Sequence, residues 1–282
     1  MKVFILTLII AACLASNDPL LEQQWKSFKA DFKKVYKSPN EEAIRFRNFE
    51  KNLNEINEHN EKYRKGLETY TLGLNQFADL SSEEIVSYTS QSQLKPSQSG
   101  ESPFEAPLGA VPSTKNWKEE KVVTPVEDQG KDCKASWAFS TAGVIESNYA
   151  IREGKDKLVG LSPQNLIDCA KEYGESSCKG GNPEHALHFI DDYGIMKEID
   201  YPYEARDGAT CEFDEGKSVT KISKYIKIPS GSEEQLKKVV GLRGPVVANI
   251  HATSKFVKYD YGVFYDEQCS SVESNLNYTV LV

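Results

Sequence analysis

A stretch of small and polar residues at positions 90–110 divides this sequence into two parts of different texture. Ser, Gln, Pro and Gly dominate the stretch and large apolar residues are few, which is typical of a linker whose backbone is open to a processing protease. Before it, apolar residues recur at helical spacing. After it, helix signals come first and strand signals follow, which favours an α+β fold in two halves.

The first 15 residues have the three parts of a secretory signal peptide. Lys2 gives a positive start, residues 3–12 are an apolar run, and Cys13 and Ala15 are small residues at positions −3 and −1 of a cut after Ala15. The apolar run is too short to span a bilayer. We therefore predict entry into the secretory pathway, a secreted or lysosomal destination, and no membrane span.

Composition excludes some classes of partner. The net charge is −8 and no dense patch of Lys and Arg is present, which argues against a nucleic-acid partner. No CxxC motif or His/Cys cluster has the spacing of zinc ligands, so we expect no metal and no cofactor. A length of 282 residues allows one or two domains with a sizeable core.

Cysteine usage fits a secreted protein. Of 6 cysteines, Cys13 would leave with the signal peptide, so five remain. In an oxidising compartment these five are disulfide candidates, and an odd number means that at least one is unpaired or pairs outside the chain. They are Cys133, Cys169, Cys178, Cys211 and Cys269.

Two helices are predicted before the linker. In the first, aromatic residues recur at about one helical turn: Trp25, Phe28, Phe32 and Tyr36. The second runs from about Asn40 to Tyr63, between a start signal at Pro39 and a stop signal at Gly66. Its apolar stripe comprises Phe46, Phe49, Leu53 and Ile56.

After the linker, four helices are predicted from capping signals, and strands become frequent beyond Ser218. The first helix runs from Ser136 to about Arg152 and is ended by Gly154. The second begins at Ser162-Pro163, and the third runs from Asn182-Pro183 to Gly194. The fourth begins at Ser232, which forms a capping box with Gln235. The strands are rich in Val, Ile and Tyr and cover residues 219–228, 246–250, 262–265 and 278–282.

Two spaced motifs precede the linker and a third follows it. The first lies on one face of the longer helix and comprises Glu41, Arg45, Phe49, Asn52, Ile56 and Asn60. The second comprises Gly73, Asn75, Phe77 and Asp79. The third is the run Asp-Gln-Gly-Lys-Asp-Cys-Lys-Ala-Ser-Trp-Ala-Phe-Ser at residues 128–140. In this order and spacing, the motifs resemble those of the papain (cathepsin L-like) family of cysteine peptidase precursors.

The resemblance covers nearly the whole chain after the signal peptide and implies its organisation. Residues 16–110 would be a helical inhibitory prosegment, and residues 111–282 a papain-like domain with a helical half and a β-rich half. Cys133 would pair with Cys178 and Cys169 with Cys211. The usual partner of Cys269 would lie beyond Val282, so we expect a free thiol or an intermolecular bond, and a peptidase domain that is incomplete at its C-terminus.

The resemblance also locates a catalytic centre whose chemistry is altered. Ser136 stands at the position of the family's nucleophilic cysteine and Tyr278 at that of its histidine, while Gln129 matches the oxyanion-hole donor. A serine hydroxyl needs a general base to remove its proton, and a phenol with a pKa of about 10 is a poor one. Around Gln129 the spacing differs too, because Lys131 and Asp132 replace a single residue. Lys134 stands where the family has glycine, at the rim of the cleft.

Other positions carry two readings each. Gly180 and Gly181 match glycines that pair with an extended substrate, or they form a plain loop. His251 follows a predicted strand near the cleft, or it is a surface residue like His59, His185 and His188. Asn277 begins the sequon Asn-Tyr-Thr and is a glycan acceptor, or it is buried in a strand and unmodified.

We therefore predict a secreted papain-family homologue that is catalytically inactive and binds peptides or peptidases. One alternative is an inhibitor of active cathepsin L-like peptidases that acts through its intact prosegment motifs. Another is an active endopeptidase or esterase that uses Ser136 with a different base.

Overall fold

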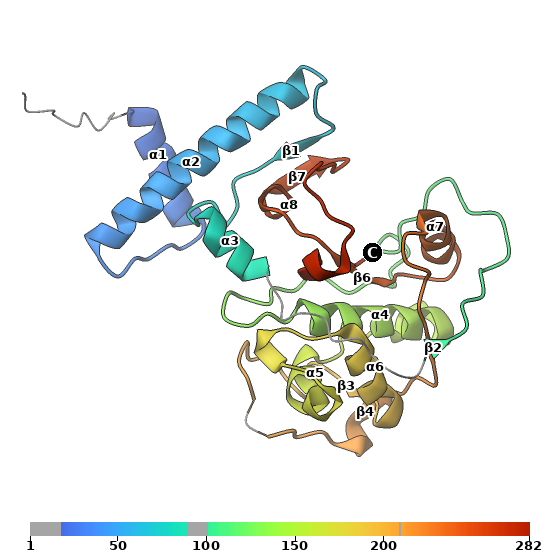
Figure 1. The fold of residues 1–282 in the computed structure, drawn as a ribbon. Coiled ribbons are helices and arrows are strands. Elements are labelled where there is room, and N and C mark those ends of the chain that lie inside the picture. The colour runs from blue at the N-terminus through green and yellow to red at the C-terminus, as the bar shows by residue number, and fades with distance from the viewer. Residues whose placement is uncertain (1–17, 90–100, 209) are drawn as a thin grey trace, which may run out of the picture. The chain divides into compact units, whose positions relative to one another are not determined.

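The computed structural model describes residues 18–89, 101–208 and 210–282, which form two compact units (Figure 1). The predicted signal peptide and residues 90–100 of the predicted linker lie outside the described residues. The first unit comprises the described residues up to Ser81 together with Lys258–Tyr265. The second comprises Ser82–Val257 and Asp266–Val282.

The first unit is built on two helices, α1 (Pro19–Asp31) and α2 (Pro39–Arg64). Asp18 caps α1 through its side chain, and Ser38 caps α2 by accepting a hydrogen bond from the backbone of Glu41. The predicted first helix extends too far, because α1 ends before Phe32. Tyr36 nevertheless joins the aromatic core, since its ring stacks on that of Trp25 with centroids 5.7 Å apart.

The first two sequence motifs meet in this unit. Phe49 and Ile56 of α2 are buried, whereas Asn52 and Asn60 contact the chain that contains the second motif. The side-chain amide of Asn52 donates to the carbonyls of Ala78 and Leu80 at 2.8 and 2.9 Å. These asparagines therefore give hydrogen-bond partners to backbone groups of the chain that lies beside α2.

Asp79 of the second motif contacts the chain that follows α1. Its carboxylate accepts from Lys34 Nζ at 2.8 Å and from the Tyr36 hydroxyl at 2.9 Å. Asn60 holds Leu72 of strand β1 (Tyr70–Leu72) by donating to its carbonyl and accepting from its amide. Strand β1 pairs antiparallel with β7 (Tyr259–Gly262).

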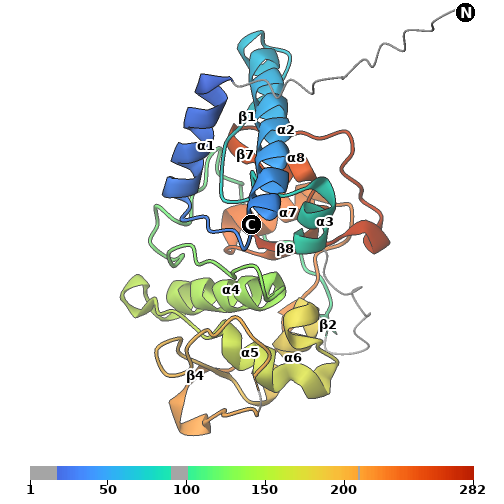
Figure 2. The same cartoon turned by 90° about the vertical axis from the view of Figure 1, so that its left-hand side faces the viewer.

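The second unit surrounds helix α4 (Ser136–Glu153). Helices α5 (Pro163–Cys169) and α6 (Pro183–Asp192) pack on one side of it, and strands β6 (Val247–Ile250) and β8 (Tyr278–Leu281) pack on the other, as Figures 1 and 2 show. The remaining α-helices and strands of this unit are α3 (Ser82–Thr89), β2 (Glu101–Ser102), β3 (Ile195–Met196), β4 (Ser218–Thr220), β5 (Tyr225–Ile226), α7 (Glu233–Leu242) and α8 (Ser254–Val257).

Small residues let α4 sit at the centre of this unit. Ala138, Ala142 and Gly143 are buried along it, and an added Cβ on Gly143 would approach Leu281 of β8 to 3.0 Å. Strands β6 and β8 pair antiparallel with Ile250 opposite Tyr278. The sheets of the described residues are two-stranded: β1-β7, β2-β5, β3-β4 and β6-β8.

The predicted α+β fold is confirmed, but three local predictions are wrong. The long strand at 219–228 is interrupted and forms only the short strands β4 and β5. The strand at 262–265 lies earlier, as β7. Helix α7 begins at Glu233 as expected, yet no side chain caps it, so the capping box of Ser232 and Gln235 does not form.

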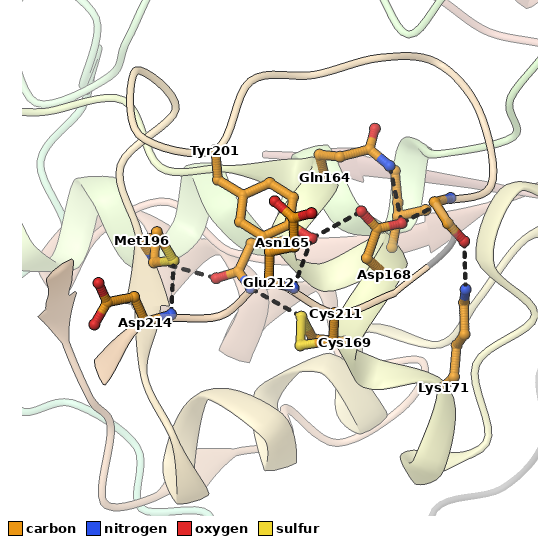
Figure 3. Close-up of a disulfide and its surroundings, with 12 residues drawn as sticks. Gln164, Asn165, Asp168, Cys169, Lys171, Met196, Tyr201, Cys211, Glu212 and Asp214 are labelled. Atoms are coloured by element: carbon orange, nitrogen blue, oxygen red, sulfur yellow. Dashed lines mark hydrogen bonds between the residues drawn. A yellow bond between two sulfur atoms is a disulfide. The ribbon is translucent and has the colours of Figure 1, made fainter. Parts of the chain in front are cut away.

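Both disulfides lie in the second unit. Cys133 bonds to Cys178 and Cys169 to Cys211, with Cα atoms 4.4 and 4.8 Å apart, while Cys269 is an exposed free thiol. Figure 3 shows the second bridge within a polar network. Asp168 accepts from the Tyr201 hydroxyl at 2.9 Å. The pKa of Tyr201 is raised to about 12, mainly by burial.

Candidate functional site

Ser136 is the first residue of helix α4 and is only 5% exposed. Its Oγ accepts a hydrogen bond from the backbone amide of Thr279 at 3.3 Å. The residue next to Tyr278 therefore contacts the hydroxyl through the backbone of β8. This contact engages an oxygen lone pair and removes no proton, so it does not activate the hydroxyl for attack.

Tyr278 begins β8 and its side chain is half-buried. Burial raises the pKa of its phenol well above the ordinary value, and the neighbouring Tyr88 and Asp128 raise it further. The phenol therefore keeps its proton throughout the acidic and neutral range. A neutral phenol accepts a proton poorly, so Tyr278 lacks the chemistry of a general base.

Gln129 is held from two directions. Its carbonyl accepts from the Tyr203 hydroxyl at 2.7 Å, and its side chain forms a hydrogen bond with Tyr88. The side chain is 6% exposed, and its Oε1 has no hydrogen-bond partner among the described residues. Burial is also the main cause that raises the pKa of Tyr203.

The residues after Gln129 form an exposed turn. Asp128 Oδ1 accepts from the amide of Gly130 at 2.8 Å, and Lys131 and Asp132 point into solvent. Lys134 is half-buried, and its amide donates to the carbonyl of Cys178 at 2.9 Å, beside the first disulfide. The extra residue is thus accommodated in the turn while Gln129 stays buried.

The glycine pair has a packing role. Gly180 has a φ of +111°, which favours glycine. A Cβ on Gly181 would lie 1.8 Å from Glu175 Oε2 and 2.6 Å from the ring of Trp137. Close approach to these two side chains is sufficient to require glycine at 181, which supports the interpretation as a structural loop.

All four histidines have structural partners. His251 Nδ1 accepts from the amide of Ser270 at 3.0 Å, and the ring of His188 packs edge-on against Tyr225. His185 Nδ1 lies 3.3 Å from Glu175 Oε1, although this nitrogen makes no hydrogen bond among the described residues. In the first unit, His59 Nε2 lies 3.0 Å from the carbonyl of Tyr70. These contacts favour the structural reading of each histidine.

The sequon lies within the packed part of the second unit. Asn277 accepts from the amide of Ala252 at 2.7 Å, and its Nδ2 donates to the Ala252 carbonyl and to Thr89 Oγ1 at 3.2 and 3.3 Å. Thr279 is 2% exposed. An N-glycan would be attached to this same Nδ2, so the folded chain favours the unmodified reading.

Sequence reasoning missed Tyr88, Tyr203 and Asp128 as parts of this site. Tyr88 and Tyr203 lie in no recognised motif, and Asp128 is the first residue of one but carried no role. In the described ranges, no three His, Cys, Asp or Glu side chains are grouped so that they could hold a metal ion. Nor does any described helix have the length and apolarity needed to cross a bilayer.

Comparison with known proteins shows which protein family has this arrangement. Residues 111–282 match the papain family of cysteine proteases. The chain belongs to this family. Residues 25–85 match the cathepsin propeptide inhibitor domain, so the papain-family domain is accompanied by a prosegment.

The papain-family relatives are cathepsins and cathepsin L-like peptidases. Cathepsin S of Bos taurus is 39% identical over 270 residues, covering 94% of this chain and 80% of the relative. A cathepsin L-like peptidase of Aedes aegypti is 40% identical over 295 residues, covering 100% and 85%. The structure of digestive procathepsin L 3 from the larval midgut of Tenebrio molitor aligns with a TM-score of 0.85 at 42% identity, covering 93% and 83%.

Proposed function

We propose that this chain is a secreted papain-family homologue that binds peptides in its cleft and does not cleave them. The observation that carries the proposal is that Ser136 and Tyr278 occupy the two positions of the family's catalytic pair. Burial holds the Tyr278 phenol in its neutral form, and the contact from β8 to the Ser136 hydroxyl is a backbone amide. A serine hydroxyl needs a proton acceptor during its attack, and a neutral phenol is a poor one.

The experiment is a turnover assay on the chain after removal of residues 16–110. We expect no hydrolysis of dipeptidyl fluorogenic substrates between pH 4 and 7, and the same baseline for Ser136→Ala. The double variant Ser136→Cys with Tyr278→His is the matched positive design, because it restores the family's pair. Hydrolysis by the natural chain that disappears in Ser136→Ala would contradict the proposal.

A second candidate is inhibition of active cathepsin L-like peptidases by the prosegment. It is favoured by the contacts of Asn52 and Asp79, which join the two prosegment motifs into one packed arrangement. Residues 16–110 expressed alone should then inhibit such a peptidase at sub-micromolar concentration. A folded fragment, with helix content confirmed by circular dichroism, that does not inhibit at tens of micromolar would exclude this role.

A third candidate, an endopeptidase or esterase that uses Ser136 with another base, has less support because each histidine has a structural partner. Labelling of Ser136 by a serine-reactive phosphonate, absent in Ser136→Ala, would establish it.

We also propose that the mature part begins near Val111 and that the chain is secreted or lysosomal. N-terminal sequencing of material recovered from culture medium and from lysosomes tests both statements.

A further inference from the structure

Two lysines stand beside the first disulfide, next to residues of the candidate site. Lys134 comes two residues before Ser136, at the start of α4, and Lys179 directly precedes Gly180 of the glycine pair. Lys134 is half-buried, whereas Lys179 is exposed. A positive charge at position 134 does not belong to the family's pattern, which has glycine there, so it is a property of this chain.

The backbone fixes the positions of the two lysines relative to one another. The amide of Lys134 donates to the carbonyl of Cys178 at 2.9 Å, and that carbonyl belongs to the peptide group that joins Cys178 to Lys179. The bond between Cys133 and Cys178 holds the same two segments with Cα atoms 4.4 Å apart. The amide of Lys179 donates to the carbonyl of Ser176 at 3.0 Å. Because the backbone is held at both positions, less conformational entropy is lost when the two side chains bind a ligand.

Neither lysine is neutralised by a neighbouring carboxylate. In the described part of the chain, no ion pair involves Lys134 or Lys179. Asp207 Oδ1 accepts from the amide of Cys178 at 2.7 Å, and Asp132 is exposed in the preceding turn. Because the whole chain has a net charge of −8, a polyanion is repelled at longer range. The local positive charge therefore favours a ligand that has a single acidic group.

The start of α4 favours the same sign of charge on a ligand. Ala135 is the N-cap residue and provides no side-chain hydrogen bond, so the amides of the first turn have no side-chain cap. A helix of 18 residues has the positive end of its dipole at this point. The Ser136 hydroxyl is uncharged, and burial holds the Tyr278 phenol in its neutral form. The residues at the two catalytic positions thus bring no negative charge that would repel a carboxylate.

We propose that the cleft of this chain selects peptides that have an acidic side chain, Asp or Glu, at the position that faces Lys134 and Lys179. This inference rests on the proposed function, because it names the class of peptide that a cleft without turnover would hold. The carboxylate accepts charge-assisted hydrogen bonds from the ammonium groups. A glutamine at the same position of the peptide keeps the shape of a glutamate and lacks its charge, so it separates recognition of charge from recognition of shape.

The test is peptide binding to the natural chain after cleavage near Val111, with the uncleaved chain titrated in parallel. Fluorescein-labelled hexapeptide pools have glutamate fixed at each position in turn, and a matched set of pools has glutamine there instead. Fluorescence anisotropy measures the Kd of each pool. At one fixed position we expect a Kd about fivefold lower for glutamate than for glutamine, as one or two solvent-exposed ion pairs imply. Added salt should reduce this difference.

Substitution of the lysines identifies the groups that recognise the carboxylate. Lys134→Gln and Lys179→Gln should each reduce the preference for glutamate, and the double variant should abolish it without changing the Kd of the glutamine pools. Lys217→Gln is the matched control, because Lys217 is an exposed lysine in the turn before β4 and its loss changes the net charge equally. Circular dichroism checks that each variant is folded.

The possible outcomes separate this inference from the proposed function. Equal affinities for the glutamate and glutamine pools at every position would overturn the acidic selectivity alone. The same holds for a preference that survives in the double variant or that Lys217→Gln reduces equally. Cleavage of the bound peptides would overturn only the proposed lack of catalysis, and absence of binding by every pool would overturn both proposals.

Discussion

At the scale of single residues, Gly181 occupies a space too small for any side chain. Glu175, which blocks it, accepts two hydrogen bonds from the amide of Asn182 at 2.9 and 3.0 Å and is therefore not free to move away. Gly181→Ala should lower the free energy of unfolding by about 1–3 kcal/mol in urea denaturation. Gly160→Ala is the control, since its Cβ would meet only Glu198 at 3.8 Å. Its effect should stay within about 1 kcal/mol, and equal losses in both variants would contradict the packing argument.

Residue-scale prediction from sequence works where a site lies in contiguous motifs. Ser136 and Gln129 share one short run, and Tyr278 stands in another, so their positions can be assigned without coordinates. Tyr88 and Tyr203 are tens of residues away from Gln129, and only folding brings them to it. The constraint on Gly181 is equally hidden, because it depends on where Glu175 and Trp137 pack.

At the scale of elements, α5 and α7 can be compared because both have serine at the N-cap position, Ser162 and Ser232. Ser162 Oγ accepts from the amide of Asn165 at 2.9 Å and donates to the Tyr201 carbonyl at 2.6 Å, whereas Ser232 makes no cap hydrogen bond at the start of α7. Ser162→Ala should therefore cost about 1–2 kcal/mol of unfolding free energy. Ser232→Ala should cost less than about 0.5 kcal/mol. Thermal unfolding of both variants checks this, and a reversed order would overturn it.

The same pair shows why elements are only partly predictable. Ser162 is followed by Pro163, whose fixed φ is compatible with a first helical turn, so helix and cap are both predicted correctly. At Ser232 the helix forms, but the preceding turn leaves the residue with φ −100° and ψ 83°, and its side chain does not cap. Propensity identifies an element, and the neighbouring chain decides its geometry.

At the scale of the whole molecule, packing groups distant parts of the chain. Lys258–Tyr265 lies in the first unit, where the buried Lys258 Nζ is 2.6 Å from Glu55 Oε2 and β7 pairs with β1. The predicted linker separates two parts of the sequence with different residue patterns, but it does not mark the boundary between the two units. Helix α3 precedes the linker and belongs to the second unit. Such groupings are not visible in the sequence because they depend on pairings across about 200 residues.

Stability of the whole molecule should depend on pH through Glu146, which is buried, and more weakly through the half-buried Glu198 and the exposed Glu127. Burial is the main cause that raises the pKa of Glu146, Glu127 and Glu198, and the charges of Glu127 and Glu198 raise that of Glu146 further. Thr124 and the amide of Leu161 donate to Glu146 and offset part of this effect. Above the ordinary glutamate pKa of about 4.3, the folded chain binds more protons than the unfolded chain.

The free energy of unfolding should therefore fall as the pH rises above the ordinary glutamate pKa and through the raised pKa values of the folded chain. Exposed ion pairs such as Lys238–Glu234 act in the opposite direction at lower pH, but they contribute little because solvent screens them. Glu146→Gln keeps an acceptor for Leu161 and removes the titration of the carboxyl group. The unfolding free energy of this variant should therefore vary less with pH, and it should exceed that of the natural chain only near neutral pH. Urea denaturation at a series of pH values measures both curves. If the unfolding free energy of the natural chain rises with pH, or if the curve of Glu146→Gln runs parallel to it, these carboxylates do not control stability. There would then be no physical reason to expect the fold to be most stable in an acidic compartment.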